Sequence, residues 1–380
     1  MPDFLIPELA ALRTAAETLI AELDDISGRE CAEATDDHSN AGNRVRQRSR
    51  ELGLYGMTQP SELGGTGAGP LALTVVRETL AAANHSLTRY ALGPRPGILG
   101  EARGDLRSRY LQPLLNGEKR GAFAFTEPPD AKQPTSAVRE GDELVINGRK
   151  AYVTGGADAD FYMTLVNVRA PDPANAGTAM LVVDRSSPGL TLAEEFRSLE
   201  GGHHVSLVFE NVRAPIANVI GKIGEGLPRA LRNISDVRLA MAAESTGLAM
   251  WTIDFTTERL RQPHRSGSPL GEREAIRLRF ADMRIETYAA RSMLYRTARL
   301  ADAGENVINE VMATKIFATE MVGRVVDGAV QLFGGQALIQ GHPLEKLYRR
   351  VRSMRLAEGA SDLLRLNLSK GRLELDKGRL

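Results

Sequence analysis

The sequence predicts an α+β multidomain protein in which an N-terminal α-helical domain, a middle β-barrel or sandwich domain and a C-terminal helical bundle follow one another. Apolar residues recur at helical spacing up to about residue 116, then near a spacing of two up to about residue 219, and then at helical spacing again. A length of 380 residues is enough for two or three hydrophobic cores. The expected domains are residues 1–118, 119–225 and 226–380.

The N-terminal helices are predicted from two amphipathic runs. They are Leu9, Leu12, Ala16, Leu19 and Leu23, and then Leu73, Val76, Leu80 and Ala83. The segment Pro60–Pro70 between them is predicted to be a loop because its glycines and prolines disfavour regular structure. Its glycines do not match the dinucleotide pattern G-x-G-x-x-G, since the sixth position from Gly65 is Pro70.

The middle domain is predicted from short strands with no helices between them, which favours a barrel or a sandwich. Asn147-Gly148 stands between two apolar runs and predicts a β-hairpin with a type I′ turn. Further strands are expected at residues 161–168, 179–183 and 205–209, separated by turn-forming stretches at 171–177 and 187–189.

The C-terminal bundle is predicted from long helical runs joined by short turns. The runs cover residues 227–260, 271–303, 306–333 and 344–373. The last run is expected to falter at Gly359, with Ser361 capping a new helix. Glu358 would then lie in a last helical turn, where the helix dipole disfavours an acid. It is either an exposed carboxylate at a helix break or a functional one.

Two further patterns are candidates for chemistry. Arg238 falls on the apolar stripe of its predicted helix, so it either pairs with an acid, lines a cleft or extends to the surface. In the middle domain, the segments Phe123–Pro128 and Lys150–Thr154 place aromatic rings beside hydroxyl groups. They form either a wall for a planar ligand or ordinary barrel packing.

Composition limits the classes of function. Lys plus Arg and Asp plus Glu both number 48, so no basic excess indicates nucleic-acid binding. The single cysteine, Cys31, excludes cysteine-rich metal sites, and the six scattered histidines, including His203-His204, predict no metal site. The start of the chain lacks the features of a secretory signal, and no apolar window is long enough for a membrane span. A soluble, cytoplasmic protein without a membrane partner is expected.

Six segments, in order along nearly the whole chain, resemble the acyl-CoA dehydrogenase family. They are Pro60–Gly69 with the helix that follows, Gly117–Pro128, Gly141–Thr154, Gln331–Gly335, Pro343–Arg349 and Leu356–Ser361. The resemblance implies a C-terminal four-helix bundle and an FAD enzyme of fatty acid or lipid metabolism. Such an enzyme oxidises the α,β carbon–carbon bond of an acyl-CoA thioester to a trans-2-enoyl-CoA.

The resemblance also implies roles for individual residues. Glu358 corresponds to the catalytic base, and Arg238 and Gly359 to substrate-binding positions, Arg238 near the arginine that binds CoA. Flavin-contacting positions correspond to Phe123, Phe125, Thr126, Tyr152 and Thr154. The adenosine half of FAD, in the neighbouring subunit, is expected to contact Gln331, Gly334 and Gly335.

The chain departs from the family pattern in three places. The connection at residues 129–136 is shorter and puts the usual pantetheine contact in doubt. Ala360 and Asp362 stand at two cofactor-contacting positions beside the base, in place of a threonine and a polar amide. The family's Arg-x-x-Phe-Gly clamp on the FAD diphosphate aligns with Pro263 and Ser266, so both contacts are lost unless another arginine substitutes or a partner chain supplies them. Arg265 is predicted to substitute, with Arg259 and Arg261 as alternatives.

The expected partners are an acyl-CoA substrate and an electron-transfer flavoprotein, in a homodimer or homotetramer. Two other functions remain open at this point. The fold could serve an oxidase or monooxygenase that uses dioxygen, although the retained Glu358 argues against a monooxygenase. Alternatively, the chain could be one subunit of a mixed oligomer and supply only part of the flavin site.

Overall fold

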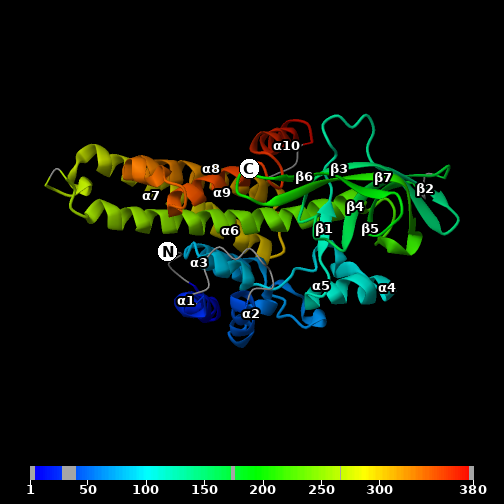
Figure 1. Cartoon of the computed structure of the whole chain (residues 1–380), viewed down its shortest axis with the longest axis horizontal. Helices are drawn as coiled ribbons and strands as arrows, with labels where there is room; N and C mark the ends of the chain where they lie inside the picture. Colours follow the sequence, from blue (N-terminus) through cyan, green and yellow to red (C-terminus); the bar gives the residue numbers. More distant parts are fainter. Residues whose placement is uncertain (1–4, 28–39, 173–175, 266, 376–380) are drawn as a thin grey trace. The chain divides into compact units, whose positions relative to one another are not determined.

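The computed structural model describes residues 5–27, 40–172, 176–265 and 267–375 (Figure 1). Cys31, Ser266 and part of the expected turn at 171–177 lie outside these ranges. Contacts divide the chain into two compact units. The first unit combines Met1–Gly93 with Ser235–Leu380, and the second is Pro94–Ile234.

The first unit is helical, as the sequence predicts. Its N-terminal helices are α1 (Pro7–Ser27), α2 (Asn40–Glu51) and α3 (Pro70–Ala81). Its C-terminal helices are α6 (Gly226–Arg261, which contains the unit boundary), α7 (Glu274–Asp302), α8 (Ile308–Phe333), α9 (Pro343–Met354) and α10 (Ser361–Leu373). The last predicted run is therefore two helices, and the break begins after Met354 rather than at Gly359.

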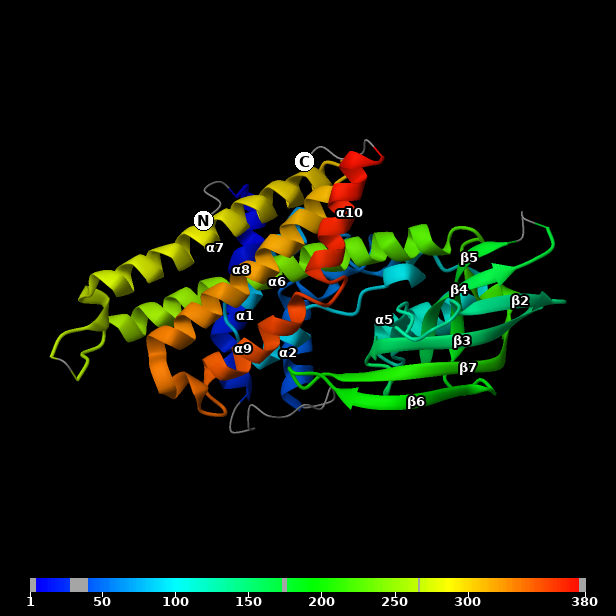
Figure 2. The ribbon, with the colours of Figure 1, turned by 90° about the horizontal axis from the view of Figure 1, so that it is seen from above.

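The apolar stripes read from the sequence face two cores of this unit. Leu19 and Leu23 of α1 pack with Val76 of α3. Helices α7, α8 and α9 run alongside one another in both views (Figures 1 and 2) and share a second core with α6. Leu248, Met321 and Val322 are completely buried in it. Burial of such residues, at about 25 cal/mol per Å² of apolar area, stabilises the bundle.

The second unit is built on one sheet of mixed direction. Its strands are β1 (Gly121–Ala124), β2 (Ser136–Glu140), β3 (Glu143–Thr154), β4 (Phe161–Arg169), β5 (Gly177–Asp184), β6 (Leu190–Arg197), β7 (His203–Pro215) and β8 (Val219–Ile220). The order is β6-β7-β3-β2-β4-β5-β8, with β1 beside β4, and among the described strands only the pairs β1–β4 and β2–β4 are parallel. Two short helices, α4 (Gly104–Leu106) and α5 (Gln112–Asn116), precede it.

The hairpin predicted at Asn147-Gly148 is wrong, because β3 continues through this dipeptide (Figure 2). The strand pairs with β2 on one side and β7 on the other, and the register shifts between Ile146 and Gly148. The Asn147 side chain accepts a hydrogen bond from the backbone N–H of Asn211 at 2.9 Å. The dipeptide is therefore a bulge, and pairing along both edges of β3 outweighs the local preference for a turn.

Gly148 is required at this bulge. Its φ is +143°, and an added Cβ would lie 2.6 Å from the Cα of Thr135. We expect Gly148→Ala to lower the free energy of unfolding by about 2–4 kcal/mol, measured by urea denaturation. Gly323→Ala in α8 is the control, because a Cβ there meets nothing within 4 Å. A loss no larger than the control's would contradict this account of the bulge.

Candidate functional site

Glu358 lies in a turn between α9 and α10, defined here as the 355–360 turn, and not in the last turn of a helix as predicted. Its carboxylate is half-buried, and its φ of +55° is left-handed. Gly359 follows with a φ of +102°. A left-handed non-glycine residue costs of order 1–3 kcal/mol and persists only where its surroundings hold it.

The helices on either side of this turn, α9 and α10, both pack against α8. Leu364 of α10 is completely buried with Met312 and Ile316 of α8. Arg365 donates to both carboxylate oxygens of Glu320, at 2.7 and 2.8 Å. Helix α9 packs into the same core as α8. The ends of the turn are thereby fixed to one rigid element.

Ser361 is the first residue of α10 and not its cap, which is Ala360. This corrects the predicted capping role. The backbone N–H of Ser361 donates to the carbonyl oxygen of Arg355 at 3.0 Å, and its hydroxyl donates to the same oxygen at 3.3 Å. Ser361 therefore closes the 355–360 turn. Asp362 is exposed in the first turn of α10, where an acid complements the helix dipole.

Two cations contact successive carbonyl groups of the turn. Arg238 of α6 donates from Nε to the carbonyl oxygen of Glu358 at 2.8 Å. Lys315 of α8 donates from Nζ to the carbonyl oxygen of Gly359 at 2.9 Å, and its side chain is completely buried. Burial lowers the pKa of Arg238 below its ordinary value, whereas the nearby Glu358 raises it. Burial and the charge of Arg238 lower the pKa of Lys315 to about 8.

The predicted flavin contacts of the second unit lie on two adjoining segments. Phe123 and Phe125 are stacked, with ring centroids 5.7 Å apart. The backbone N–H of Ala151 donates to the carbonyl oxygen of Thr126 at 2.9 Å, which joins this segment to β3. Thr126 is exposed and the two phenylalanines are half-buried. These side chains can present an aromatic surface with an adjacent hydroxyl group.

An ion pair between the buried Lys150 and the half-buried Glu127 holds the segment that carries Phe125. The Lys150 ammonium donates to the carbonyl oxygen of Phe125 at 3.0 Å and to Oε1 of Glu127 at 2.6 Å. Thr135 donates to the same carboxylate through its backbone N–H, at 3.1 Å, and its hydroxyl, at 3.0 Å. Burial lowers the pKa of Lys150, and the bond to Glu127 opposes that effect. The half-buried carboxylate thus accepts from three donors and pairs with the buried ammonium group, which a buried charge requires.

The exposed Tyr152 and Thr154 contact the half-buried Phe196 and His204. Tyr152 is 57% exposed and has a φ of +56°, and its ring meets that of Phe196 edge to face with centroids 5.7 Å apart. Phe196 stacks on His204, and the Thr154 hydroxyl lies 3.2 Å from Nδ1 of His204. Four non-glycine residues with positive φ are found in the described ranges, and Tyr152 and Glu358 are two of them.

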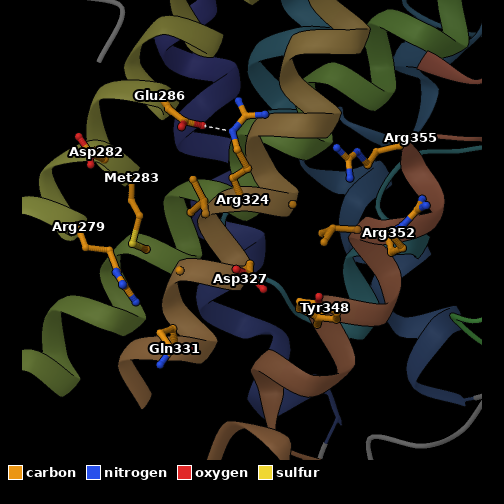
Figure 3. Close-up of a pocket in the computed structure, with 14 residues that line it drawn as sticks. Arg279, Asp282, Met283, Glu286, Arg324, Asp327, Gln331, Tyr348, Arg352 and Arg355 are labelled. Carbon is orange, nitrogen blue, oxygen red and sulfur yellow. Dashed lines mark hydrogen bonds and ion pairs between the residues drawn. The ribbon is translucent and has the colours of Figure 1, made fainter. Parts of the chain in front are cut away.

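The predicted adenosine contacts lie along the bundle of the first unit. Gln331 lines a cavity of about 520 Å³ between α7, α8 and α9 (Figure 3). Arg279, Arg352 and Arg355 line the same cavity, and none of these guanidinium groups makes an ion pair with the described residues. Arg324 is instead paired with Glu286 at 2.7 Å. The cavity therefore offers an amide together with a mixed lining of guanidinium groups and the carboxylates of Asp282 and Asp327.

A second cavity, of about 360 Å³, adjoins the turn that contains Gly334 and Gly335. Arg259, Phe333 and Gln336 are among the residues that line it. The Nε of Arg259 is buried and has no hydrogen-bond partner in the described part of the chain. Arg265, the residue predicted to contact the diphosphate, is exposed and lines neither cavity. Pro263 is exposed in the same connection.

Among the residues that the structure describes, no group of three His, Cys, Asp or Glu side chains could hold a metal ion. His203 and His204 are neighbours on β7 and make separate contacts: His203 lies 3.1 Å from Glu195, and His204 contacts Thr154. No helix in the described ranges is both long and apolar enough to cross a membrane.

The chain combines N-terminal helices, a central sheet and a C-terminal helical bundle, and comparison with known proteins identifies this arrangement. The N-terminal, middle and C-terminal domain models of acyl-CoA dehydrogenase match residues 8–118, 122–212 and 224–373. An acyl-CoA dehydrogenase of Bacillus subtilis is 30% identical over 84% of this chain and 86% of its own length. The chain belongs to the acyl-CoA dehydrogenase family.

Two further similarities agree with this assignment. The mitochondrial short-chain specific acyl-CoA dehydrogenase of Rattus norvegicus is 30% identical over 83% of this chain and 79% of its own. The structure of butyryl-CoA dehydrogenase from Megasphaera elsdenii superposes with a TM-score of 0.79 over 98% of this chain and 99% of its own. At 23% identity, that likeness shows the fold alone.

Several contacting residues escape prediction from the sequence. No sequence pattern indicates that Lys315 contacts the turn, because a single lysine in an amphipathic helix is typical of an exposed face. His204 and Phe196 could have been found only from the strand pairing of β6 and β7. Lys150 and Glu127 lie within the quoted motifs, but their pairing depends on the fold.

Lys315 gives a testable pH dependence. Because its pKa of about 8 lies below the ordinary 10.5, the folded protein binds this proton more weakly than the unfolded chain does. The resulting loss of stability is full below about pH 8 and disappears as the pH rises to 10.5. The free energy of unfolding of the wild type, relative to Lys315→Met, should rise across that window by at most about 1.4 kcal/mol per pH unit. Parallel stability curves would show that Lys315 keeps its ordinary proton affinity.

Proposed function

We propose that this chain is an FAD-dependent acyl-CoA dehydrogenase that desaturates the α,β bond of an acyl-CoA thioester. The observation that carries the proposal is the geometry of Glu358, a half-buried carboxylate in a left-handed turn held by two cations. Membership of the family and the Bacillus and Rattus relatives support it. When bound, FAD supplies the acceptor for the hydride that leaves the substrate β-carbon.

Glu358 acts as the base in this proposal. The α-proton of a thioester is weakly acidic, so the carboxylate must be held close to it and be partly withdrawn from water. Glu358 takes that proton while the β-hydrogen leaves as hydride, and the substrate loses both as it becomes the trans-2-enoyl-CoA. Arg238 keeps Nε on the Glu358 carbonyl, and its terminal nitrogens make no hydrogen bond to the described residues. Those nitrogens are the part that could contact CoA, with Gly359 beside them.

The residues of the chain fit FAD on three grounds. The surface formed by Phe123, Phe125 and Thr126 suits a flat ring system with polar edges. Tyr152 and Thr154 add a second aromatic ring and hydroxyl group on β3. In the bundle, the Nε of Arg259 has no hydrogen-bond partner among the described residues and suits an anionic diphosphate, although Glu258 lines the same cavity. Gln331, Gly334, Gly335, Ala360 and Asp362 remain the other proposed cofactor contacts.

Glu358→Gln should abolish turnover while FAD binding is retained, because the amide keeps the size of the carboxylate but cannot accept the proton. We expect the rate of flavin reduction by acyl-CoA esters to fall by about 10²–10⁴-fold, measured by stopped-flow bleaching of the flavin. A panel of saturated esters of increasing chain length gives the substrate range. Glu374→Gln, at the exposed end of α10, is the control. Near-normal reduction in Glu358→Gln would mean that the base is another residue.

FAD titration of arginine variants tests the diphosphate contact. Arg259→Ala should weaken FAD by about 10- to 100-fold, equivalent to the loss of a charged hydrogen bond of about 1.5–3 kcal/mol. Arg265→Ala tests the position favoured by the sequence, and Arg261→Ala the third alternative. We expect the loss to be largest for Arg259, whose side chain lines the cavity beside Gln336. Unchanged affinity in all three variants would favour a mixed oligomer in which a second chain completes the site.

The same preparations distinguish the remaining alternatives. We propose an electron-transfer flavoprotein as the physiological acceptor and a homodimer or homotetramer as the assembly. Slow reoxidation of the reduced flavin in air would agree with a dehydrogenase, whereas fast reoxidation would favour an oxidase. Copurification with a related chain would support the mixed oligomer.

A further inference from the structure

Lys315 is a buried charge for which the proposed reaction has no use. It lies on α8 with its side chain completely buried, and its ammonium group is 2.9 Å from the Gly359 carbonyl oxygen and 3.5 Å from that of Arg355. Both carbonyl groups belong to the 355–360 turn. Burying an ammonium group is costly, so these contacts must offset a large desolvation penalty.

Lys315 contacts a segment whose backbone conformation is unfavourable on its own. Glu358 and Gly359 are consecutive left-handed residues, and only the second is a glycine. Arg238 holds the first carbonyl and Lys315 the second, and they come from different helices, α6 and α8. A dipeptide held at both carbonyl groups resists rotation of its intervening peptide plane, so the backbone fixes the Cα–Cβ bond from which the Glu358 side chain extends.

We propose that Lys315 is a positioning residue for Glu358, acting through the backbone of the Glu358-Gly359 dipeptide. The inference rests on the proposed role of Glu358 as the base. Lys315 touches neither substrate nor cofactor in this account. Its ammonium group holds the Gly359 carbonyl, which keeps the carboxylate in one orientation for the α-proton.

A cation suits this position better than a neutral donor. Hydrogen bonds from an ionised donor are shorter and stronger than those between neutral groups. The positive charges of Arg238 and Lys315 repel each other. The negative charges of Glu358 and Glu320 compensate for this repulsion. The carboxylate that accepts the proton is thus part of the charge balance that keeps the turn closed.

The alternative is a lysine that only stabilises the end of α9 and the start of α10. That role would change the stability of the bundle but leave the turn and the chemistry intact in the folded protein. The two roles are separable because misplacing a catalytic group by about 1 Å can cost about 10²-fold in rate at temperatures where the protein is fully folded.

The test compares Lys315→Met with a matched control in the full-length, FAD-loaded protein. Thr314→Val removes a neighbouring buried hydroxyl on α8, whose 2.8 Å contact is with Thr297 of α7 and not with the turn. Backbone amide hydrogen exchange of peptides covering residues 355–361 reports on the turn without reference to activity. Stopped-flow flavin reduction by the best acyl-CoA of the panel, well below the melting temperature, gives kcat and KM.

We expect amide exchange in residues 355–361 to be at least about 10-fold faster in Lys315→Met than in Thr314→Val. In the same variant kcat should fall by about 10- to 100-fold, with KM and FAD affinity changed by less than about threefold. If Lys315→Met does not fold, Lys315→Gln is measured instead; it keeps an uncharged donor, so smaller changes in the same direction are expected.

Two results would overturn the proposal. Exchange in the turn equal to that of the control would show that Lys315 does not hold it, whatever the activity. Faster exchange with unchanged kcat would show that the held conformation does not serve the base. If none of the acyl-CoA esters reduces the flavin of the wild type, the proposed function fails. The exchange comparison still decides whether Lys315 holds the turn.

Discussion

Both parts of the candidate site depend on one interaction, a buried or half-buried cation that donates to a backbone carbonyl group. In the second unit Lys150 holds the carbonyl of Phe125, part of the proposed flavin surface. In the first unit Lys315 does the same for Gly359, and Arg238 for Glu358. Long side chains reach from rigid helices or strands into irregular segments, which by themselves lack a repeating hydrogen-bond pattern. The irregular segments, and the functional groups on them, are thereby held in place by the helices and strands that carry the cations.

The fold was predictable wherever the hydrophobic period was strong. Helices α1, α7 and α8 follow their apolar stripes closely, because each stripe faces a core of the same unit. Periodicity failed where tertiary pairing opposed local preference. Asn147-Gly148 is a strong turn signal, yet β2 and β7 flank it on both sides and hold it in an extended strand. No local pattern records that pairing.

The sequence motifs predicted the candidate site residues, but not the residues that hold them in position. Glu358 was visible from the sequence because Gly359 and the new helix at Ser361 mark a break, although the turn begins earlier, at Arg355. Lys315 was not visible, because its burial arises only when the 355–360 turn folds over α8. The left-handed φ of Tyr152 likewise follows from a register shift between β3 and β7 rather than from its own residue type.

Helix α8 links the proposed chemistry to the proposed cofactor contacts. It carries Lys315 beside the base and Gln331 in the cavity between α7, α8 and α9. Sixteen residues of helix separate the two, a rise of about 24 Å, so one rigid element fixes both positions at once. Its buried face packs against α7, α9 and α10, so none of these helices can shift along α8 without repacking that face. Such a repacking would move the 355–360 turn together with the residues around Gln331, which couples the stability of the bundle to the geometry of the base.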